Sequence, residues 1–185
     1  MMFFSSAEQA WHDTYSTIKK STSDMTFCGG GNLDGYKTYM AELAKIKRVV
    51  DRLPSGQHHA GMILFAPEIP PRSKTFIYNL VLDNYLSTHH KRASNATQRE
   101  RMAMLVMLTI NEARLKSAGR NTHKLKTPLA QLAQCLNLKS ASQFKRDWQG
   151  HFNNYTEQLI SAGYDALKVV ESEVKNINRR YNNAA

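Results

Sequence analysis

The stretch LAQLAQCLNLKSASQFKRDWQGHF, residues 129–152, has the composition of two short helices joined by a tight turn. In a helix-turn-helix, a small residue lets the helices approach closely, one turn residue tolerates a positive φ, and a hydrophobic residue plugs the turn. Ala133, Asn137 and Leu138 stand where these three parts are needed. The sequence therefore predicts a helix-turn-helix-like segment within residues 127–152.

The second half of this stretch has the pattern of an amphipathic helix. Phe144, Trp148 and Phe152 recur every four residues, which places them on one buried face. Phe144 stands one position later than the first hydrophobic residue of the usual second helix, which predicts a turn one residue longer than the standard four. The outward face then carries side chains that can bind base edges or phosphates. These are Ser142, Gln143, Lys145, Arg146 and Gln149.

Positive charge is concentrated around the same stretch. The chain has 25 Lys and Arg against 15 Asp and Glu, a formal net charge of +10. Residues 119–152 contain six Lys and Arg against the single acid Asp147, so half of the net charge lies there. Such clustering is expected of a phosphate-binding surface. With three flanking lysines, the predicted DNA-binding set comprises Lys124, Lys126, Lys139, Ser142, Gln143, Lys145, Arg146 and Gln149.

The remainder of the chain shows helical periodicity and no alternation typical of strands, so the predicted fold is all-α and compact. Helices are predicted near residues 6–20, 36–53, 73–88 and 97–118, and again after a break near Gly163. Residues 21–35 are predicted to form a loop, and the proline-rich residues 57–72 an irregular segment. The predicted parts are an N-terminal helix with a Gly-rich loop (1–35), a helical core (36–160) and a C-terminal helix (161–185).

Apolar residues at steps of three and four predict which helix faces are buried. In the helix near 36–53 they are Tyr39, Leu43, Ile46, Val50 and Leu53. In the helix near 97–118 they are Met102, Leu105, Val106, Thr109 and Ala113. In the last helix they are Leu167, Val170, Val174 and Ile177.

Several function classes lack their sequence signatures. Cys28 and Cys135 are the only cysteines and stand far apart, so we expect neither a disulfide framework nor a zinc site. The glycine-rich Gly30–Thr38 misses the P-loop pattern because Tyr36 stands where the lysine is needed. No nucleophile can be matched with a base. We therefore expect no enzymatic activity, no cofactor and no bound metal.

The apolar runs of the sequence are short. None approaches the roughly twenty residues that span a bilayer. Polar residues follow Met1–Phe4 at once, which is unlike a signal peptide. We expect a protein of the cytoplasm with no membrane contact.

Three pieces of the chain together resemble a family. They are the Gly-rich Phe27–Asn32, a basic helical middle, and the stretch Thr127–Leu136 continuing to Phe144–Trp148. This layout, covering residues 27–152, resembles the Q-type antiterminators of lambdoid phages. The resemblance implies a protein that binds DNA beside a promoter and then joins RNA polymerase in the bacterial host cell to override pausing and termination. Some of these proteins carry a cysteine zinc motif, which this chain lacks.

Two functions are compatible with the sequence. One is a DNA-binding transcription regulator that acts with RNA polymerase. The other is a basic helical adaptor or RNA-binding subunit of a larger nucleoprotein complex, without sequence-specific DNA contacts. A regulator should prefer one DNA site at physiological salt, whereas an adaptor should bind DNA and RNA alike and lose both as salt rises.

Overall fold

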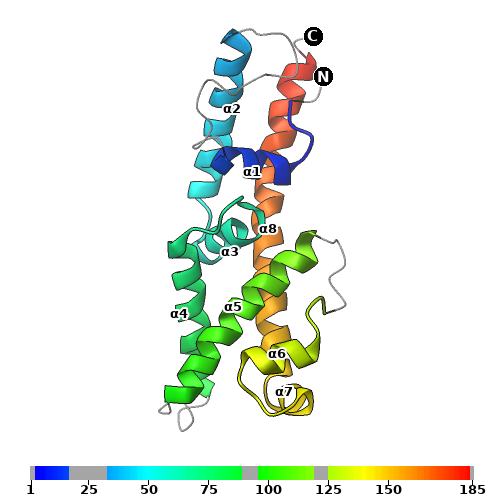
Figure 1. The fold of residues 1–185 in the computed structure, drawn as a ribbon. Helices are drawn as coiled ribbons and strands as arrows, with labels where there is room; N and C mark the ends of the chain where they lie inside the picture. The colour runs from blue at the N-terminus through cyan, green and yellow to red at the C-terminus, as the bar shows by residue number, and fades with distance from the viewer. Residues whose placement is uncertain (1–2, 17–32, 89–95, 119–124, 184–185) are drawn as a thin grey trace.

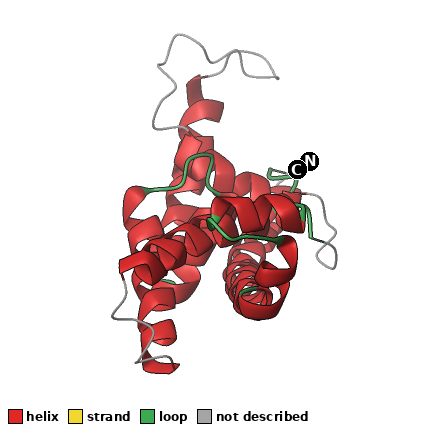
Figure 2. Ribbon diagram, turned by 60° about the horizontal axis from the view of Figure 1, so that its bottom comes forward, coloured by secondary structure: helices red, strands yellow, loops and turns green. Residues whose placement is uncertain are grey.

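The computed structural model describes residues 3–16, 33–88, 96–118 and 125–183, and all regular secondary structure in these residues is α-helical, as predicted (Figure 2). The helices are α1 (Ala7–Ser16), α2 (Leu33–Asp51), α3 (Ser55–Phe65), α4 (Pro71–Thr88), α5 (Ala96–Ala118), α6 (Leu129–Cys135), α7 (Ala141–Asp147) and α8 (Gln149–Asn183). The predicted loop 21–35 lies mostly outside the described residues, and its last residues, Leu33 to Gly35, already belong to α2.

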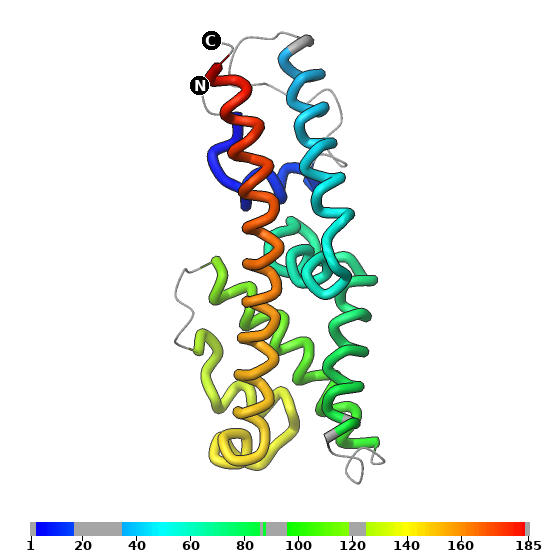
Figure 3. The backbone as a smooth tube through the Cα atoms, turned by 180° about the vertical axis from the view of Figure 1, so that it is seen from behind, coloured from blue at the N-terminus to red at the C-terminus, as the bar shows by residue number. Residues whose placement is uncertain are grey.

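Helix α8 runs the whole length of the molecule (Figure 3). Its 35 residues correspond to roughly 52 Å at 1.5 Å per residue. The break predicted near Gly163, and with it a separate helix from 161, is wrong. Gly163 is buried inside α8, and a Cβ at this position would collide with the side chain of Leu64. The glycine therefore permits a close approach of α3 rather than ending the helix.

The prediction of an irregular segment at 57–72 is also wrong for its first part, which belongs to α3. Pro54 stands at the N-cap, and the next proline, Pro67, follows the end of the helix, so no proline interrupts it. Five consecutive residues, Ala60 to Leu64, are buried. A helix buried on all sides has no amphipathic stripe.

Two hydrophobic clusters stack along α8, and α3 contributes to both. One contains Phe4, Trp11 and Ile46 together with the C-terminal half of α8. The other joins α4, α5, α6 and α7 to the N-terminal half of α8. Leu43, Ile46 and Val50 of the predicted α2 stripe are buried, as are all five residues predicted for α5 and Val170, Val174 and Ile177. The remaining residues of the predicted stripes are half-buried: Tyr39, Leu53 and Leu167.

The two described chain ends lie together at one end of the molecule, and α6 and α7 lie at the other (Figure 1). The Asn178 side chain holds the N-terminal segment there: its Oδ1 accepts the amides of Phe3 and Phe4 at 2.8 and 3.1 Å. The Phe3 ring stacks on Tyr181 at a centroid distance of 4.5 Å. The two described chain ends therefore lie away from the α6–α7 end.

Candidate nucleic-acid interface

Helices α6 and α7 flank a turn whose hydrogen bonds close it tightly. Asn137 has φ 52°, the positive value predicted for it. The amide of Leu138 donates to the carbonyl of Ala133 at 2.9 Å, and the amide of Asn137 donates to that of Gln134 at 3.0 Å. This pair of bonds is the Schellman arrangement that ends a helix with a left-handed residue. The residues between the helices, 136–140, number five, so the turn is one residue longer than the standard four, as predicted.

Arg101 of α5 holds this turn from outside. Its Nε donates to the carbonyl of Leu136 at 3.1 Å, and its Nη2 donates to that of Asn137 at 3.2 Å. These carbonyls follow the end of α6 and have no partner within a helix. Sequence reasoning missed this role, although Arg101 directly precedes the buried Met102 and thus borders the apolar side of its helix.

A buried carboxylate fixes the chain where it enters α6. Glu112 of α5 is fully buried and accepts three hydrogen bonds: from the amide of Lys126 at 2.6 Å, and from the amide and hydroxyl of Thr127 at 3.1 and 2.8 Å. A buried charge requires such compensation. No sequence pattern could predict this contact, because Glu112 lies 14 residues from Lys126 along the chain.

Helix α7 begins with a side-chain cap and ends at a buried tryptophan. The Ser140 hydroxyl accepts the amide of Gln143 at 3.2 Å, and Oε1 of Gln143 accepts the amide of Lys139 at 3.1 Å. Phe144 and Phe152 are fully buried and Trp148 is nearly so, as predicted. The prediction that all three lie on one helix is wrong, because only Phe144 belongs to α7, while Phe152 belongs to α8. Trp148 separates α7 from α8, so the predicted second helix is only two turns long before the chain changes direction.

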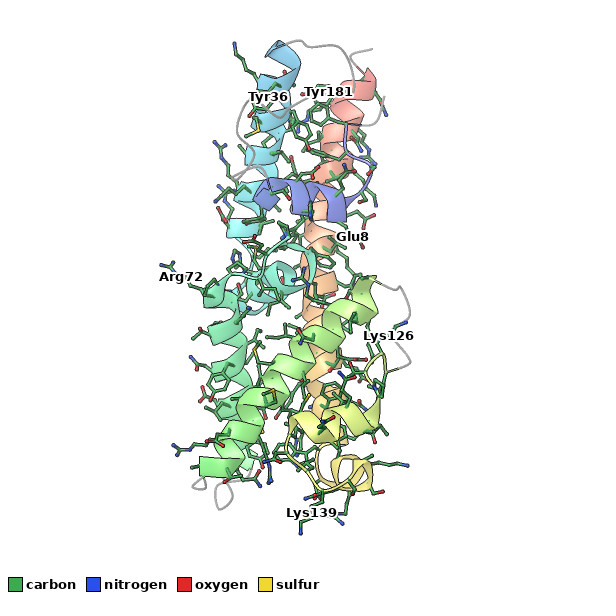
Figure 4. All side chains as sticks on the ribbon, in the orientation of Figure 1. Glu8, Tyr36, Arg72, Lys126, Lys139 and Tyr181 are labelled. Carbon is green, nitrogen blue, oxygen red and sulfur yellow. The ribbon has the colours of Figure 1, made fainter. Side chains whose placement is uncertain are left out.

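The structure brings together six members of the predicted DNA-binding set. Lys139, Ser142, Lys145 and Arg146 are exposed, and Gln143 and Gln149 are half-buried. Lys126 is exposed but projects from the side of the molecule, whereas Lys139 projects from its end (Figure 4). Lys124 lies outside the described residues.

The six side chains differ in the ion pairs and hydrogen bonds that they already form. Lys139 and Lys145 form no ion pair with any residue that the structure describes. The Arg146 guanidinium, by contrast, donates from Nε and Nη2 to the two carboxylate oxygens of Asp147 at 2.8 and 3.0 Å. This hydrogen bond raises the pKa of Arg146 above its usual value. The Gln143 carboxamide oxygen already accepts the Lys139 amide in the cap. Among the predicted DNA-binding residues described at this end, Lys139 and Lys145 are therefore the cations without an acidic partner.

Comparison of the chain with protein-family profiles, with curated proteins and with solved structures finds no match. Within the described ranges, no three His, Cys, Asp or Glu side chains gather as a metal would require. Over the same ranges, no helix combines the length and apolar character needed to cross a bilayer. Cys135 is exposed as a free thiol at the end of α6. The arrangement at α6 and α7 thus offers charge and hydrogen-bonding groups on a fixed frame.

Proposed function

We propose that this chain binds double-stranded DNA with the α6–α7 end, as a helix-turn-helix-like transcription regulator. One observation carries the proposal. The outer face of α7 presents Lys145 and Ser142 to solvent, while its inner face is anchored by the fully buried Phe144. A short helix with one anchored and one polar face can enter the major groove.

The rigidity of this end favours binding. Arg101 secures the carbonyls of the turn and Glu112 secures the residues before α6, so both boundaries of the hairpin are tied to α5. A preorganised surface loses less conformational entropy on binding than a flexible one. Little ordering would then be needed when α7 meets DNA.

The proposed contacts divide by chemistry. Lys139 and Lys145 neutralise phosphates, which supports binding to any sequence. Ser142, Gln149 and Arg146 provide the sequence-dependent contacts to base edges. Arg146 has three N–H donors left after its two bonds to Asp147, since a guanidinium carries five.

A protein partner is part of the proposal, and the outer face of α5 supports it. Met104, Met107 and Leu115 are exposed there by 42, 41 and 50%. Exposed apolar side chains on one helix face are typical of protein–protein contacts. In a regulator this partner would be RNA polymerase. The same face equally supports the alternative of a basic adaptor or RNA-binding subunit.

Selection from a pool of random DNA duplexes, followed by competition with RNA at physiological salt, tests the function. The proposal predicts an enriched site that the protein prefers over random DNA by about 10³-fold or more. Arg146→Ala should reduce this preference at a cost of roughly 1–3 kcal/mol. Equal binding to random duplex and RNA, with no enriched site, would instead support the adaptor.

A further inference from the structure

A polar cavity of about 330 Å³ lies beside the α6–α7 hairpin. It is enclosed by the last turn of α4, the first turns of α5 and α8, and α7. Gln98 and Arg101 of α5 form one wall. Arg146 and Asp147 of α7 form another, and His151 of α8 completes the polar lining. Two guanidinium groups therefore line the same cavity as a single carboxylate.

Both arginines line the cavity and retain N–H donors that their own hydrogen bonds do not use. Arg101 uses Nε and Nη2 for the carbonyls of Leu136 and Asn137, and Arg146 uses the same two nitrogens for Asp147. Each guanidinium carries five N–H donors, so three remain on each. Guanidinium groups bind phosphate oxygens through paired N–H donors. The cavity thus has the donors that a phosphate group needs.

The cavity is also held in shape before any ligand arrives. Arg101 is fixed by the turn, and the nearly buried rings of Tyr85 and Trp148 stack with 6.2 Å between their centroids on the inner side. Its volume exceeds the needs of an inorganic ion, because a water molecule occupies only about 30 Å³ in the liquid. Room is left for an organic group beside the phosphate.

The walls beside the arginines favour an organic group that donates hydrogen bonds. The Asp147 carboxylate can only accept them. The Gln98 Oε1 is buried and has no partner among the described residues. The terminal amide of Gln98 rotates about a torsion angle that has broad energy minima. Such a rotation would present this acceptor to a donor in the cavity. Hydroxyl or amino groups on the ligand would give the Gln98 oxygen a partner and would add a donor to the Asp147 carboxylate, which already accepts two hydrogen bonds from Arg146.

We propose that this cavity binds a small organic phosphate monoester. Its phosphate contacts Arg101 and Arg146, and its hydroxyl or amino groups contact Asp147 and Gln98. A nucleoside monophosphate and a sugar phosphate share this chemistry. Because Arg101 also holds the α6–α7 turn, the ligand would stabilise the hairpin from the cavity side. The proposal does not depend on DNA binding.

Isothermal titration calorimetry of the full chain without DNA tests this site. The probes are AMP, glucose 6-phosphate, inorganic phosphate, adenosine and glucose. At least one of the two esters should bind ten or more times more tightly than inorganic phosphate and than its own unphosphorylated parent. Binding of AMP alone would identify a nucleotide site, and binding of glucose 6-phosphate alone a sugar-phosphate site. Esters that bind no better than inorganic phosphate would overturn the proposal.

Two variants of α7 separate the cavity from general electrostatic attraction. Arg146→Ala removes a cavity residue, whereas Lys145→Ala removes the same charge from the neighbouring exposed position, which does not line the cavity. Arg146→Ala should weaken the ester at least tenfold, and Lys145→Ala should leave its affinity within about twofold. Equal losses in the two variants, or no loss in Arg146→Ala, would contradict the assignment.

Discussion

Gly61 is the position where α3 meets α1, and its replacement by alanine tests the packing of a helix that sequence patterns did not reveal. A Cβ at Gly61 would collide with ring carbons Cη2 and Cζ2 of Trp11, whose indole is fully buried. The indole ring is rigid, so its contacting atoms cannot move aside as the end of a flexible side chain could. Overpacking of this kind costs about 1–3 kcal/mol. Alanine offsets part of this cost, because its helix propensity is about 1 kcal/mol more favourable than that of glycine. We expect Gly61→Ala to lower the free energy of unfolding by up to about 2 kcal/mol.

Gly56 is the matched control because it lies on the same helix and a Cβ there would meet nothing within 4 Å. Gly56→Ala should raise the free energy of unfolding by about 0.5–1 kcal/mol, since only the propensity gain applies. Urea denaturation followed by circular dichroism measures both variants. If Gly61→Ala stabilises the protein as much as Gly56→Ala does, the close contact of α3 with α1 is wrong.

Three further perturbations test local parts of the structure. Asn137→Ala should destabilise the protein by about 1 kcal/mol because of the positive φ, whereas Asn137→Gly should be nearly neutral in the same urea experiment. Glu112→Gln should cost about 1–3 kcal/mol and speed amide exchange at Lys126 or Thr127, because the glutamine NH₂ group replaces one carboxylate oxygen and leaves one of these two amides without its acceptor. Burial, aided by the hydrogen bond to Asp13, raises the pKa of Tyr39 above its usual 10.0. The folded state therefore holds this proton longer than the unfolded chain, so stability should fall as the pH rises above 10, and less steeply in Tyr39→Phe.

Local patterns sufficed for α2 and α5, in each of which one helix face is buried and the other exposed. The stripes of α2 and α5 follow directly from the spacing of apolar residues, and the turn at Asn137 follows from residues within ten positions of it. Helix α3 was missed because it is buried on several sides and so has no periodic contrast between faces. Gly163 was misread because a glycine required by a tertiary contact looks the same in sequence as one that ends a helix.

In the candidate site, too, some features could be predicted from local sequence patterns and others could not. The outward position of Lys145 could be predicted, since its helix neighbours Phe144 and Trp148 define the inner face. The support from Arg101 and Glu112 could not, because both act across more than a dozen residues of chain. Nor could the pairing of Arg146 with its neighbour Asp147 be inferred from charge alone.

The salt dependence of DNA binding by two single-lysine variants tests the proposed interface most directly. Lys145 lies on α7, and Lys74 is an exposed lysine at the start of α4, away from this end. Each alanine variant removes one positive charge, so the net charge of the chain stays matched.

Fluorescence anisotropy with a labelled duplex would give the affinity at several salt concentrations. If Lys145 contacts a phosphate, Lys145→Ala should reduce the slope of log K against log salt by about 0.9 and weaken binding roughly eightfold at 0.1 M salt, while Lys74→Ala should leave both unchanged. Equal effects of the two variants would contradict binding through the α6–α7 end.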